Sequence, residues 1–391
     1  MDNNNNDLIA PITPEEVFAA HRGGKLSIKS SRPLTSKRDL SIAYSPGVAE
    51  ACLAIKEDPA RARELTGISR TVAVVSDGSA VLGLGNIGPH AALPVMEGKC
   101  QLFTTFADLN AIPIVLDVHS ADEIVAAVTA IAPSVGAINL EDIAAPICFE
   151  VEQRLEESLN IPVFHDDQHG TAVVVTAGLA NACRVTGRNL EDLRVVVSGA
   201  GAAGVACTRM LLESGVKDIV VLDSRGIVSQ GRENLNPVKE KIAEVTNPRG
   251  LTGGPAEAFT GADAFIGVSR GHVGEELLQL MAPEPILFSL ANPDPEIPVE
   301  LANKYGSVVA TGRSDLPNQV NNVLAFPGIF AGALAAGATH IAPAMKLAAS
   351  KAIAACVGDD LAADFIMPSP LDPKVEPAVS KAVQEAARKE G

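Results

Sequence analysis

The stretch LRVVVSGAGAAGVACTRMLLESGVKDIVVLD, residues 193–223, decides the fold of this chain. It reads as an apolar strand over 193–198, a glycine loop of pattern G-x-G-x-x-G over 199–204, a helix, and a second strand that ends in Asp223. The glycines allow a tight turn and let backbone N–H groups approach a pyrophosphate, and an acid about 20 residues past the loop can hydrogen-bond a ribose hydroxyl. The stretch therefore predicts a dinucleotide-binding domain of the doubly wound Rossmann type.

The sequence leaves the choice between NAD and NADP open. Asp223 favours NAD because its carboxylate can pair with free ribose hydroxyls, whereas Arg225 is close enough to meet a 2′-phosphate and Ser224 leaves room for one. The predicted cofactor-binding residues are Gly199, Ala200, Gly201, Ala202, Ala203, Gly204, Asp223 and Arg225.

Strands and helices alternate on both sides of this stretch, which predicts parallel sheets with right-handed crossovers. The further strands are expected at residues 71–77, 111–118, 136–140, 161–164, 262–268, 285–293 and 307–312. We expect two α/β domains, as is usual at 391 residues. They are an N-terminal substrate- and metal-binding domain over residues 13–163 and a Rossmann domain with C-terminal helices over 164–391. An Asn-rich segment over residues 1–12 is predicted to be disordered.

The composition argues against several classes of protein. The chain has 31 basic and 47 acidic residues and no cluster of basic and aromatic side chains, so nucleic acid is not an expected partner. It has no run of about 18 apolar residues and no basic-then-apolar leader, so we expect a cytoplasmic protein that does not enter membranes. Its 6 cysteines lack C-x-x-C spacing, which argues against a disulfide framework or a zinc site.

Two pairs of acidic residues follow two strands of the N-terminal half. Glu141 and Asp142 come directly after the strand at 136–140, and Asp166 and Asp167 follow the strand at 161–164. Neighbouring parallel strands end at one edge of a sheet, so the four carboxylates are expected to converge. Ligands that are all oxygens favour Mg²⁺ or Mn²⁺. Capping of the following helix is the alternative for Asp166 and Asp167.

Other polar residues are candidates for acid–base chemistry or ligand contact. Lys99 would become a base if it were desolvated, and the alternative is a solvated surface lysine. Tyr44 precedes a Ser-Pro-Gly turn and is either an acid or a packing residue, while Asn321 and Asn322 either cap a helix or contact a ligand. A metal, a base and an acid beside a nicotinamide would suit oxidation of a 2-hydroxy acid.

Several long motifs together resemble the malic enzyme family in its short bacterial form. They are SIAYSPGVAE (41–50), SDGSAVLGLGNIGP (76–89), PVMEGK (94–99), GAINLEDI (136–143), FHDDQHGTA (164–172), VSGAGAAG (197–204) and NNVLAFPGIFAGAL (321–334). The resemblance runs from about residue 14 to the C-terminal helices. It implies oxidative decarboxylation of L-malate to pyruvate and CO₂ with NAD⁺ or NADP⁺, and it suggests a homodimer.

The resemblance also implies roles for individual residues. Glu141, Asp142 and Asp167 match the metal ligands, and Lys99 matches the base that takes the C2 hydroxyl proton, with Asp166 beside it. Tyr44 matches the acid that protonates C3. The remaining matches are residues 200–203 as pyrophosphate contacts, Asn292 as a cofactor contact and Asn322 as a contact of the substrate carboxylate.

The chain departs from the family pattern at one site position. Larger members carry an arginine that grips malate where this chain has Ala80. The chain also ends without the acyltransferase-like extension of some bacterial members, so regulation through such a domain is not expected. Two rival functions are a malolactic enzyme, which would release lactate, and a non-catalytic dinucleotide sensor.

Overall fold

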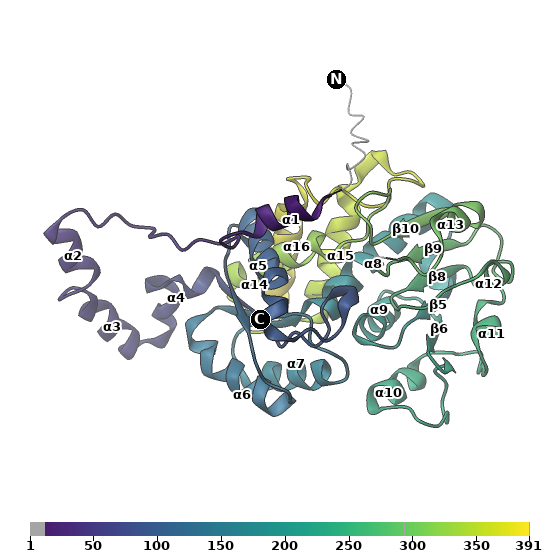
Figure 1. Ribbon diagram of the computed structural model, residues 1–391, viewed down its shortest axis with the longest axis horizontal. Helices are drawn as coiled ribbons and strands as arrows, with labels where there is room; N and C mark the ends of the chain where they lie inside the picture. The colour runs from purple at the N-terminus through teal and green to yellow at the C-terminus, as the bar shows by residue number, and fades with distance from the viewer. Residues whose placement is uncertain (1–11, 293, 391) are drawn as a thin grey trace, which may run out of the picture.

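A computed structural model of the chain describes residues 12–292 and 294–390, and its two sheets confirm the predicted α/β class (Figure 1). The first sheet has the order β2-β1-β3-β4, and all its strands are parallel. Its elements are β1 (Thr71–Ser76), α5 (Gly88–Ala107), β2 (Asn110–Val115), α6 (Ala121–Ile131), β3 (Ala137–Leu140), α7 (Ile147–Ser158) and β4 (Val163–His165). The helix α5 runs through Pro94 and Gly98 without a break.

Alternate residues of β1 face two different cores, because successive side chains of a strand point to opposite faces. Val72 and Val74 pack in the core that contains Met96 and Phe103 of α5. Ala73 and Val75 pack in the core formed with α6 and α7. All six residues of β1 are buried, as expected for a central parallel strand.

The second sheet has the order β10-β9-β8-β5-β6-β7, in which only the short edge strand β7 is antiparallel among the described strands. Its strands are β5 (Arg194–Ser198), β6 (Asp218–Asp223), β7 (Gly226–Ile227), β8 (Ala264–Gly267), β9 (Ile286–Ser289) and β10 (Val308–Thr311). The connecting helices are α9 (Ala202–Glu213), α10 (Pro237–Val245), α11 (Pro255–Phe259), α12 (Glu275–Leu278) and α13 (Val299–Tyr305). This arrangement is the doubly wound sheet predicted from residues 193–223.

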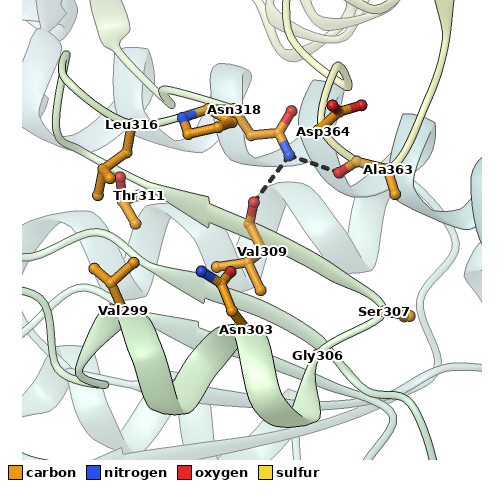
Figure 2. Close-up of a pocket in the computed structure, with 11 residues that line it drawn as sticks. Val299, Asn303, Gly306, Ser307, Val309, Thr311, Leu316, Asn318, Ala363 and Asp364 are labelled. Carbon is orange, nitrogen blue, oxygen red and sulfur yellow. Dashed lines mark hydrogen bonds between the residues drawn. The ribbon is translucent and has the colours of Figure 1, made fainter. Parts of the chain in front are cut away.

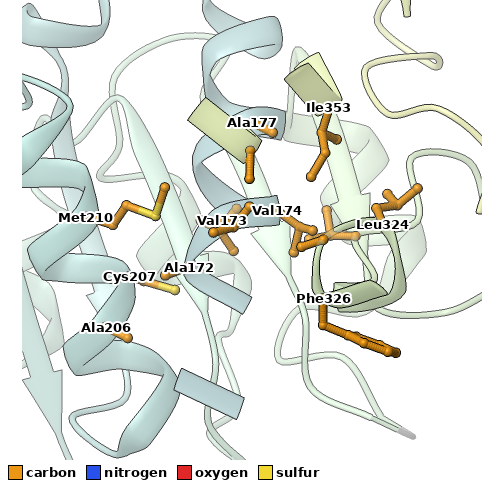
Figure 3. Packing of buried hydrophobic residues seen from close by; sticks show 14 of the residues in the cluster. Ala172, Val173, Val174, Ala177, Ala206, Cys207, Met210, Leu324, Phe326 and Ile353 are labelled. Carbon is orange, nitrogen blue, oxygen red and sulfur yellow. The ribbon is translucent and has the colours of Figure 1, made fainter. Parts of the chain in front are cut away.

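The helix α8 (Asp166–Thr186) follows β4 of the first sheet and leads to β5 of the second. Its residues Ala172, Val173 and Val174 are buried in one continuous core with Cys207 of α9 and with Ile353 (Figure 3). The helix begins at Asp166 with His165 as its N-cap, so Asp166 and Asp167 belong to its first turn and do not precede it as capping residues. The carboxylates therefore sit where the positive end of the helix dipole favours them.

Three C-terminal helices complete the body, namely α14 (Phe326–Ala336), α15 (Pro343–Cys356) and α16 (Val375–Glu390). Besides packing on one another, α15 packs on α8 and α14 packs on α5, the helix that covers β1 and β2 of the first sheet. The ring of Phe103 in α5 makes edge contacts with Phe326 and Phe330 of α14, at centroid distances of 4.8 and 5.2 Å. The domain boundaries at 163 and 164 stay a prediction.

An N-terminal arm, residues 28–65, stands away from this body in Figure 1. It carries α2 (Lys37–Ala43), α3 (Val48–Glu57) and α4 (Ala62–Leu65), and none of these helices has a buried residue. The helix α1 (Pro14–His21) precedes the arm, and Thr13 and Glu16 form a capping box at its start. The predicted disorder of residues 1–12 falls almost wholly outside the described residues. No helix among the described residues has the length and apolar character needed to span a bilayer.

Candidate active site

Three acidic side chains meet at the carboxyl ends of β3 and β4. Carboxylate oxygens of Glu141, Asp142 and Asp167 all lie within 4.8 Å of one another. Glu141 and Asp142 are buried, with 6% and 5% of their surface exposed, while the side chain of Asp167 is 35% exposed. The backbone N–H of Asp142 donates to Asp167 Oδ2 at 2.8 Å, which fixes the loop after β3 relative to the first turn of α8. Three hard oxygen donors that are this close fit a divalent cation such as Mg²⁺ or Mn²⁺.

Lys99 lies beside this cluster and is 7% exposed, so it is not the surface lysine of the alternative interpretation. Its Nζ donates to Glu141 Oε1 at 2.9 Å and also to Asp166 Oδ2. The same Nζ lies 3.9 Å from the centroid of the Phe326 ring. Burial would lower the pKa of Lys99, but the charges of Asp166 and Glu141 outweigh burial and raise it. Burial and the neighbouring charge of Glu141 raise the pKa of the Asp166 carboxyl, against the opposing effect of Lys99.

Two residues hold Asp166 in place. Asn322, at the start of a short helix over Asn322–Leu324, donates from Nδ2 to Asp166 Oδ2. Gly170 lies one helical turn after Asp166, and a Cβ atom at Gly170 would come within 1.9 Å of Asp166 Oδ1. Asp166 can therefore keep its position only because residue 170 is a glycine. The sequence interpretation missed Gly170, although it lies within the motif at 164–172 that carried the resemblance.

Two further polar residues that were missed support the carboxylates. Asn139 Nδ2 donates to Glu141 Oε2 at 2.8 Å, which leaves Glu141 Oε1 for Lys99. Glu152 of α7 is 6% exposed and accepts from the backbone N–H of His165 at 2.7 Å. It also accepts from the side chains of Gln168 and His169, both at 3.0 Å. Burial would raise the pKa of Glu152, but the His169 ring outweighs it and lowers that pKa to about 2. Glu152 thus fixes the turn that carries Asp166 and Asp167.

A cavity of about 720 Å³ opens at the glycine loop of the second sheet. Gly199, Ala200 and Gly201 line it, and a Cβ atom at Gly201 would meet no heavy atom within 4 Å. A Cβ atom at Gly204 would come within 1.7 Å of Gly199 O, so this position admits only glycine. The helix α9 begins at Ala202, and its free N–H groups suit a pyrophosphate in the open space beside Gly201.

Asp223 lines the same cavity at the end of β6, but cations surround its carboxylate. Arg232 donates to both carboxylate oxygens, and Lys239 Nζ donates to Oδ2 at 2.7 Å. Burial would raise the pKa of Asp223, but the hydrogen bonds from Arg232 and Lys239 hold it well below its usual value of 3.8. Neither cation was singled out from the sequence. The side chain of Arg225 is exposed, and only its backbone N–H contacts Asp223, at 2.9 Å.

The structure does not bring three other positions into these clusters. Tyr44 caps α2 on the arm and is 70% exposed. Asn292 is exposed after β9 and donates to Gly312 O at 3.4 Å, without lining the 720 Å³ cavity. Ala80 offers its backbone N–H to Asp142 O at 2.9 Å. Arg270, after β8, lines the cavity and donates to Gly83 O at 2.6 Å, so a cation does reach the loop next to Ala80.

A second cavity of about 230 Å³ lies away from this chemistry, between α13, β10 and residues 363–364 (Figure 2). Its main polar feature is Asn318, whose Nδ2 donates to Val309 O and Ala363 O at 2.9 and 2.8 Å. These bonds fasten a loop to the edge of the second sheet. Because these two bonds occupy the amide of Asn318, we assign the cavity a structural role.

Comparison with known proteins identifies the family of this chain. Residues 23–123 match the malic enzyme N-terminal domain, and residues 168–387 match the malic enzyme NAD binding domain. The chain is 53% identical to the NAD-dependent malic enzyme of Geobacillus stearothermophilus, covering 96% of this chain and 79% of that one. It is equally identical to the bifunctional malic/malolactic enzyme of Bacillus subtilis, covering 96% and 93%. The crystal structure of malic enzyme from Pyrococcus horikoshii superposes with a TM-score of 0.93 at 44% identity, over 96% of this chain and 91% of that one.

Both domain matches, the sequence identity over almost the whole chain and the superposition point to one conclusion. The relatives include both NAD- and NADP-dependent enzymes, such as the NADP-dependent malic enzyme of Escherichia coli, at 47% identity over 93% of this chain and 51% of that one. This chain is therefore a nicotinamide-dependent enzyme and belongs to the malic enzyme family.

Proposed function

We propose that this enzyme converts L-malate to pyruvate and CO₂, with reduction of NAD⁺ or NADP⁺, and that the reaction requires Mg²⁺ or Mn²⁺. The observation that carries the proposal is the cluster of Glu141, Asp142 and Asp167 around the buried pair of Lys99 and Asp166. One ammonium faces four carboxylates there, so the cluster as it stands has an excess of negative charge that a divalent cation would neutralise.

Glu141, Asp142 and Asp167 would hold the cation, with Asp167 the most open of the three to solvent and substrate. When bound, the cation would supply Lewis-acid stabilisation of negative charge on the substrate oxygens. Asn322 Nδ2 is placed beside Asp166 and is proposed to meet a substrate carboxylate as well. Asn139 and Glu152 keep the carboxylates oriented, as their hydrogen bonds indicate.

Lys99 and Asp166 are proposed to move the proton of the C2 hydroxyl. Lys99 passes its own proton to Asp166 along their direct hydrogen bond, which frees Nζ to accept the hydroxyl proton. A bound nicotinamide would supply the acceptor for the C2 hydride, so that loss of the hydroxyl proton and of this hydride would leave oxaloacetate. The bond between C3 and C4 then breaks, CO₂ departs, and its electron pair stays on C3 as the enolate of pyruvate. An acid must finally donate a proton to C3.

Tyr44 is the proposed acid, and we propose that it acts in the site of a second copy of this chain. Within one chain Tyr44 is exposed on the arm, and no hydrogen bond joins its hydroxyl to any described residue. Four apolar side chains of the arm are 47–61% exposed, namely Leu34, Leu40, Ile42 and Leu53. This exposure has an unfavourable hydration free energy, which burial against a partner would remove. A homodimer joined by the arms would thus bury these residues and deliver Tyr44 to the partner's Lys99 cluster.

Mixing two inactive variants tests this arrangement. Tyr44→Phe and Lys99→Ala homodimers should each lack activity. After joint refolding or subunit exchange, mixed dimers contain one site with both residues intact, so activity should return to about a quarter of the wild-type level. No recovery in a preparation shown to contain mixed dimers would contradict the sharing of Tyr44 between subunits.

Arg270 is proposed to supply the positive charge that is missing at Ala80. Its guanidinium reaches Gly83 O at 2.6 Å from the cofactor side of the cavity. Arg270→Gln should raise the KM for malate about tenfold, the usual cost of one charge-assisted hydrogen bond, with a smaller change in kcat. An unchanged KM for malate would exclude Arg270 from substrate binding.

The reaction is tested with purified protein, L-malate and Mn²⁺, with NAD⁺ and NADP⁺ in parallel and both pyruvate and lactate quantified. Reduced cofactor and pyruvate in equal amounts support the proposal. Lactate without reduced cofactor would favour malolactic chemistry. The 53% identity to a bifunctional malic/malolactic enzyme is the reason to test this alternative. Absence of any product would favour the sensor alternative.

A further inference from the structure

A chain of hydrogen bonds joins the C-terminal helix α15 to the first turn of α8. Nζ of Lys346, in α15, lies 3.2 Å from Nδ1 of His169, in α8. The other ring nitrogen of His169, Nε2, lies 3.0 Å from the carboxylate of Glu152, in α7. Glu152 also accepts from the backbone N–H of His165 at 2.7 Å, directly before Asp166. Lys346 is thus linked through two side chains to the turn that carries the proposed metal and proton-transfer residues.

The two ends of this chain determine which nitrogen of the His169 ring carries the proton. A lysine ammonium has three N–H groups and no acceptor, so Nδ1 must accept from Lys346. A doubly protonated ring would place an N–H group against the ammonium, where neither group can accept. The proton of a neutral ring then lies on Nε2, which donates to Glu152. The opposite tautomer would instead turn a lone pair toward an ionised carboxylate, which has no proton to donate.

Burial makes the bond between His169 and Glu152 costly to lose. Glu152 is 6% exposed, and the His169 side chain is 20% exposed. The His169 ring lies 5.3 Å from the ring of Phe164 in β4, measured between centroids. A buried carboxylate that loses a donor must find another or move. Because Glu152 also holds the backbone of His165, a movement of its carboxylate would displace the first turn of α8.

Water could not replace Lys346 in this role. Lys346 and His169 line a cavity of about 170 Å³ between α8, α9 and α15, whose other polar lining residues are Gln168, Arg209 and Glu213. A water molecule that took the place of the ammonium in this cavity could either donate to Nδ1 or accept from it, so it would not specify a tautomer. A fixed tautomer requires a group at this position that only donates, and the ammonium is such a group.

We infer that Lys346 is a positioning residue, which holds the first turn of α8 in its active geometry through His169 and Glu152. Its loss should weaken metal binding by Asp167 and slow the proton transfer that is proposed for Asp166. The inference rests on the proposed function for the roles of these two carboxylates, whereas the tautomer of the ring can be measured without it. Lys346 is 177 residues from His169 in the sequence, so no local pattern indicates this link.

Nitrogen-15 NMR of the chain labelled at histidine measures the tautomer directly. His169→Gln assigns the signal among the 7 histidines of the chain. In the wild type the His169 ring should be neutral with its proton on Nε2, and Lys346→Ala should give a mixture of tautomers. Lys346→Arg keeps a group that only donates and should retain the wild-type signal. A proton on Nδ1 in the wild type, or an unchanged signal in Lys346→Ala, would overturn the inference.

Mn²⁺ binding without substrate, followed by electron paramagnetic resonance, measures the consequence at the metal site. Lys346→Ala should bind Mn²⁺ about tenfold more weakly than the wild type, at the lower end of the range for residues that support metal ligands. Its kcat should also fall about tenfold, with an unchanged KM for the dinucleotide. Lys351→Ala is the matched control, because this exposed lysine lies on the same helix and its loss removes the same charge.

A thermal melt establishes that Lys346→Ala is folded, and Lys346→Met, which keeps an apolar stem, takes its place if it is not. A folded variant that binds Mn²⁺ as the wild type does, or a control that loses as much affinity as Lys346→Ala, would contradict the assignment of Lys346. A wild-type chain that binds no Mn²⁺ would count against the proposed function instead, and the tautomer measurement would still decide the role of Lys346.

Discussion

The two charged clusters of this enzyme are opposites in composition. Around Lys99 one cation faces Glu141 and Asp166 directly, with Asp142 and Asp167 close by. Around Asp223 one carboxylate lies between Arg232 and Lys239. The Lys99 cluster has an excess of negative charge, which suits a metal cation, and the Asp223 cluster has an excess of positive charge, which suits an anion. The charge imbalance of each cluster therefore predicts the charge of the ligand that it binds. Both clusters lie at carboxyl ends of parallel strands, so the side chains alone determine which sign of charge each cluster binds.

The largest expected effect separates the two clusters. Lys99→Ala should reduce malate turnover by about 10³-fold, as expected for removal of a general base, and should leave the affinity for reduced dinucleotide unchanged. Turnover is measured from cofactor reduction, and affinity from nicotinamide fluorescence. Lys351→Ala, an exposed lysine of α15, is the control for charge removal. Activity of Lys99→Ala within tenfold of wild type would exclude Lys99 as the base.

Gly170→Ala is expected to have the next largest effect, a decrease in kcat of about 10²-fold. The new Cβ would lie 1.9 Å from Asp166 Oδ1, so Asp166 must turn away from Lys99 and Asn322. Small displacements of this kind cost about two orders of magnitude in rate. A thermal melt establishes that the variant is folded, and steady-state kinetics give kcat. A folded variant with wild-type kcat would show that the contact between Asp166 and Lys99 is dispensable.

Gly201→Ala is expected to affect only the cofactor-binding loop of the second sheet. No atom lies within 4 Å of the added Cβ, so the fold is expected to tolerate it, but the methyl group occupies the space proposed for the pyrophosphate. The KM for either dinucleotide should rise about tenfold, equivalent to about 1.4 kcal/mol, with the KM for malate little changed. Gly204→Ala should instead destabilise the fold, because its Cβ would meet Gly199 O at 1.7 Å. An unchanged dinucleotide KM in Gly201→Ala would place the pyrophosphate elsewhere.

The smallest effect concerns Glu296, a buried carboxylate with no cation partner among the described residues. It is 1% exposed and accepts from Ser269 N, Ser289 Oγ and Ala291 N, at 2.9, 3.0 and 3.2 Å. Burial raises its pKa above the ordinary value of 4.5, despite these hydrogen bonds. A raised pKa in the folded state means that its contribution to stability is fully present below pH 4.5 and is lost as the pH rises through the folded pKa.

Glu296→Gln removes this titration, so the free energy of unfolding should depend less steeply on pH above 4.5 than in the wild type. Denaturant unfolding at a series of pH values measures the two slopes. Parallel curves for wild type and variant would show that Glu296 does not titrate differently in the folded state.

Sequence alone predicted the parts of this molecule that depend on local pattern. The strand, loop and helix at 193–223 appear as β5, the glycine loop, α9 and β6, because the fingerprint encodes each step locally. The convergence of Glu141, Asp142 and Asp167 followed from the parallel order of β3 and β4. The interpretation of Asp166 and Asp167 as capping residues placed them before the helix, whereas both belong to its first turn.

The parts that were missed depend on contacts between segments far apart in the sequence. Arg232 and Lys239 reach Asp223 only because the chain folds back after β7, and no periodicity signals that fold. Glu152 is charged and lies on an amphipathic helix, where a solvent-exposed position is the usual expectation. The arm shows the same limit, since the pattern of α2 and α3 does not tell what covers them.

Equilibrium binding of Mn²⁺, followed by electron paramagnetic resonance without substrate, tests the contrast between the two clusters most directly. The account predicts one saturable Mn²⁺ per chain, bound at least tenfold more weakly in Asp167→Asn and with unchanged affinity in Asp223→Asn. A wild-type chain without a saturable Mn²⁺ site, or an Asp167→Asn variant that binds Mn²⁺ as the wild type does, would contradict the assignment of the Lys99 cluster as the metal site.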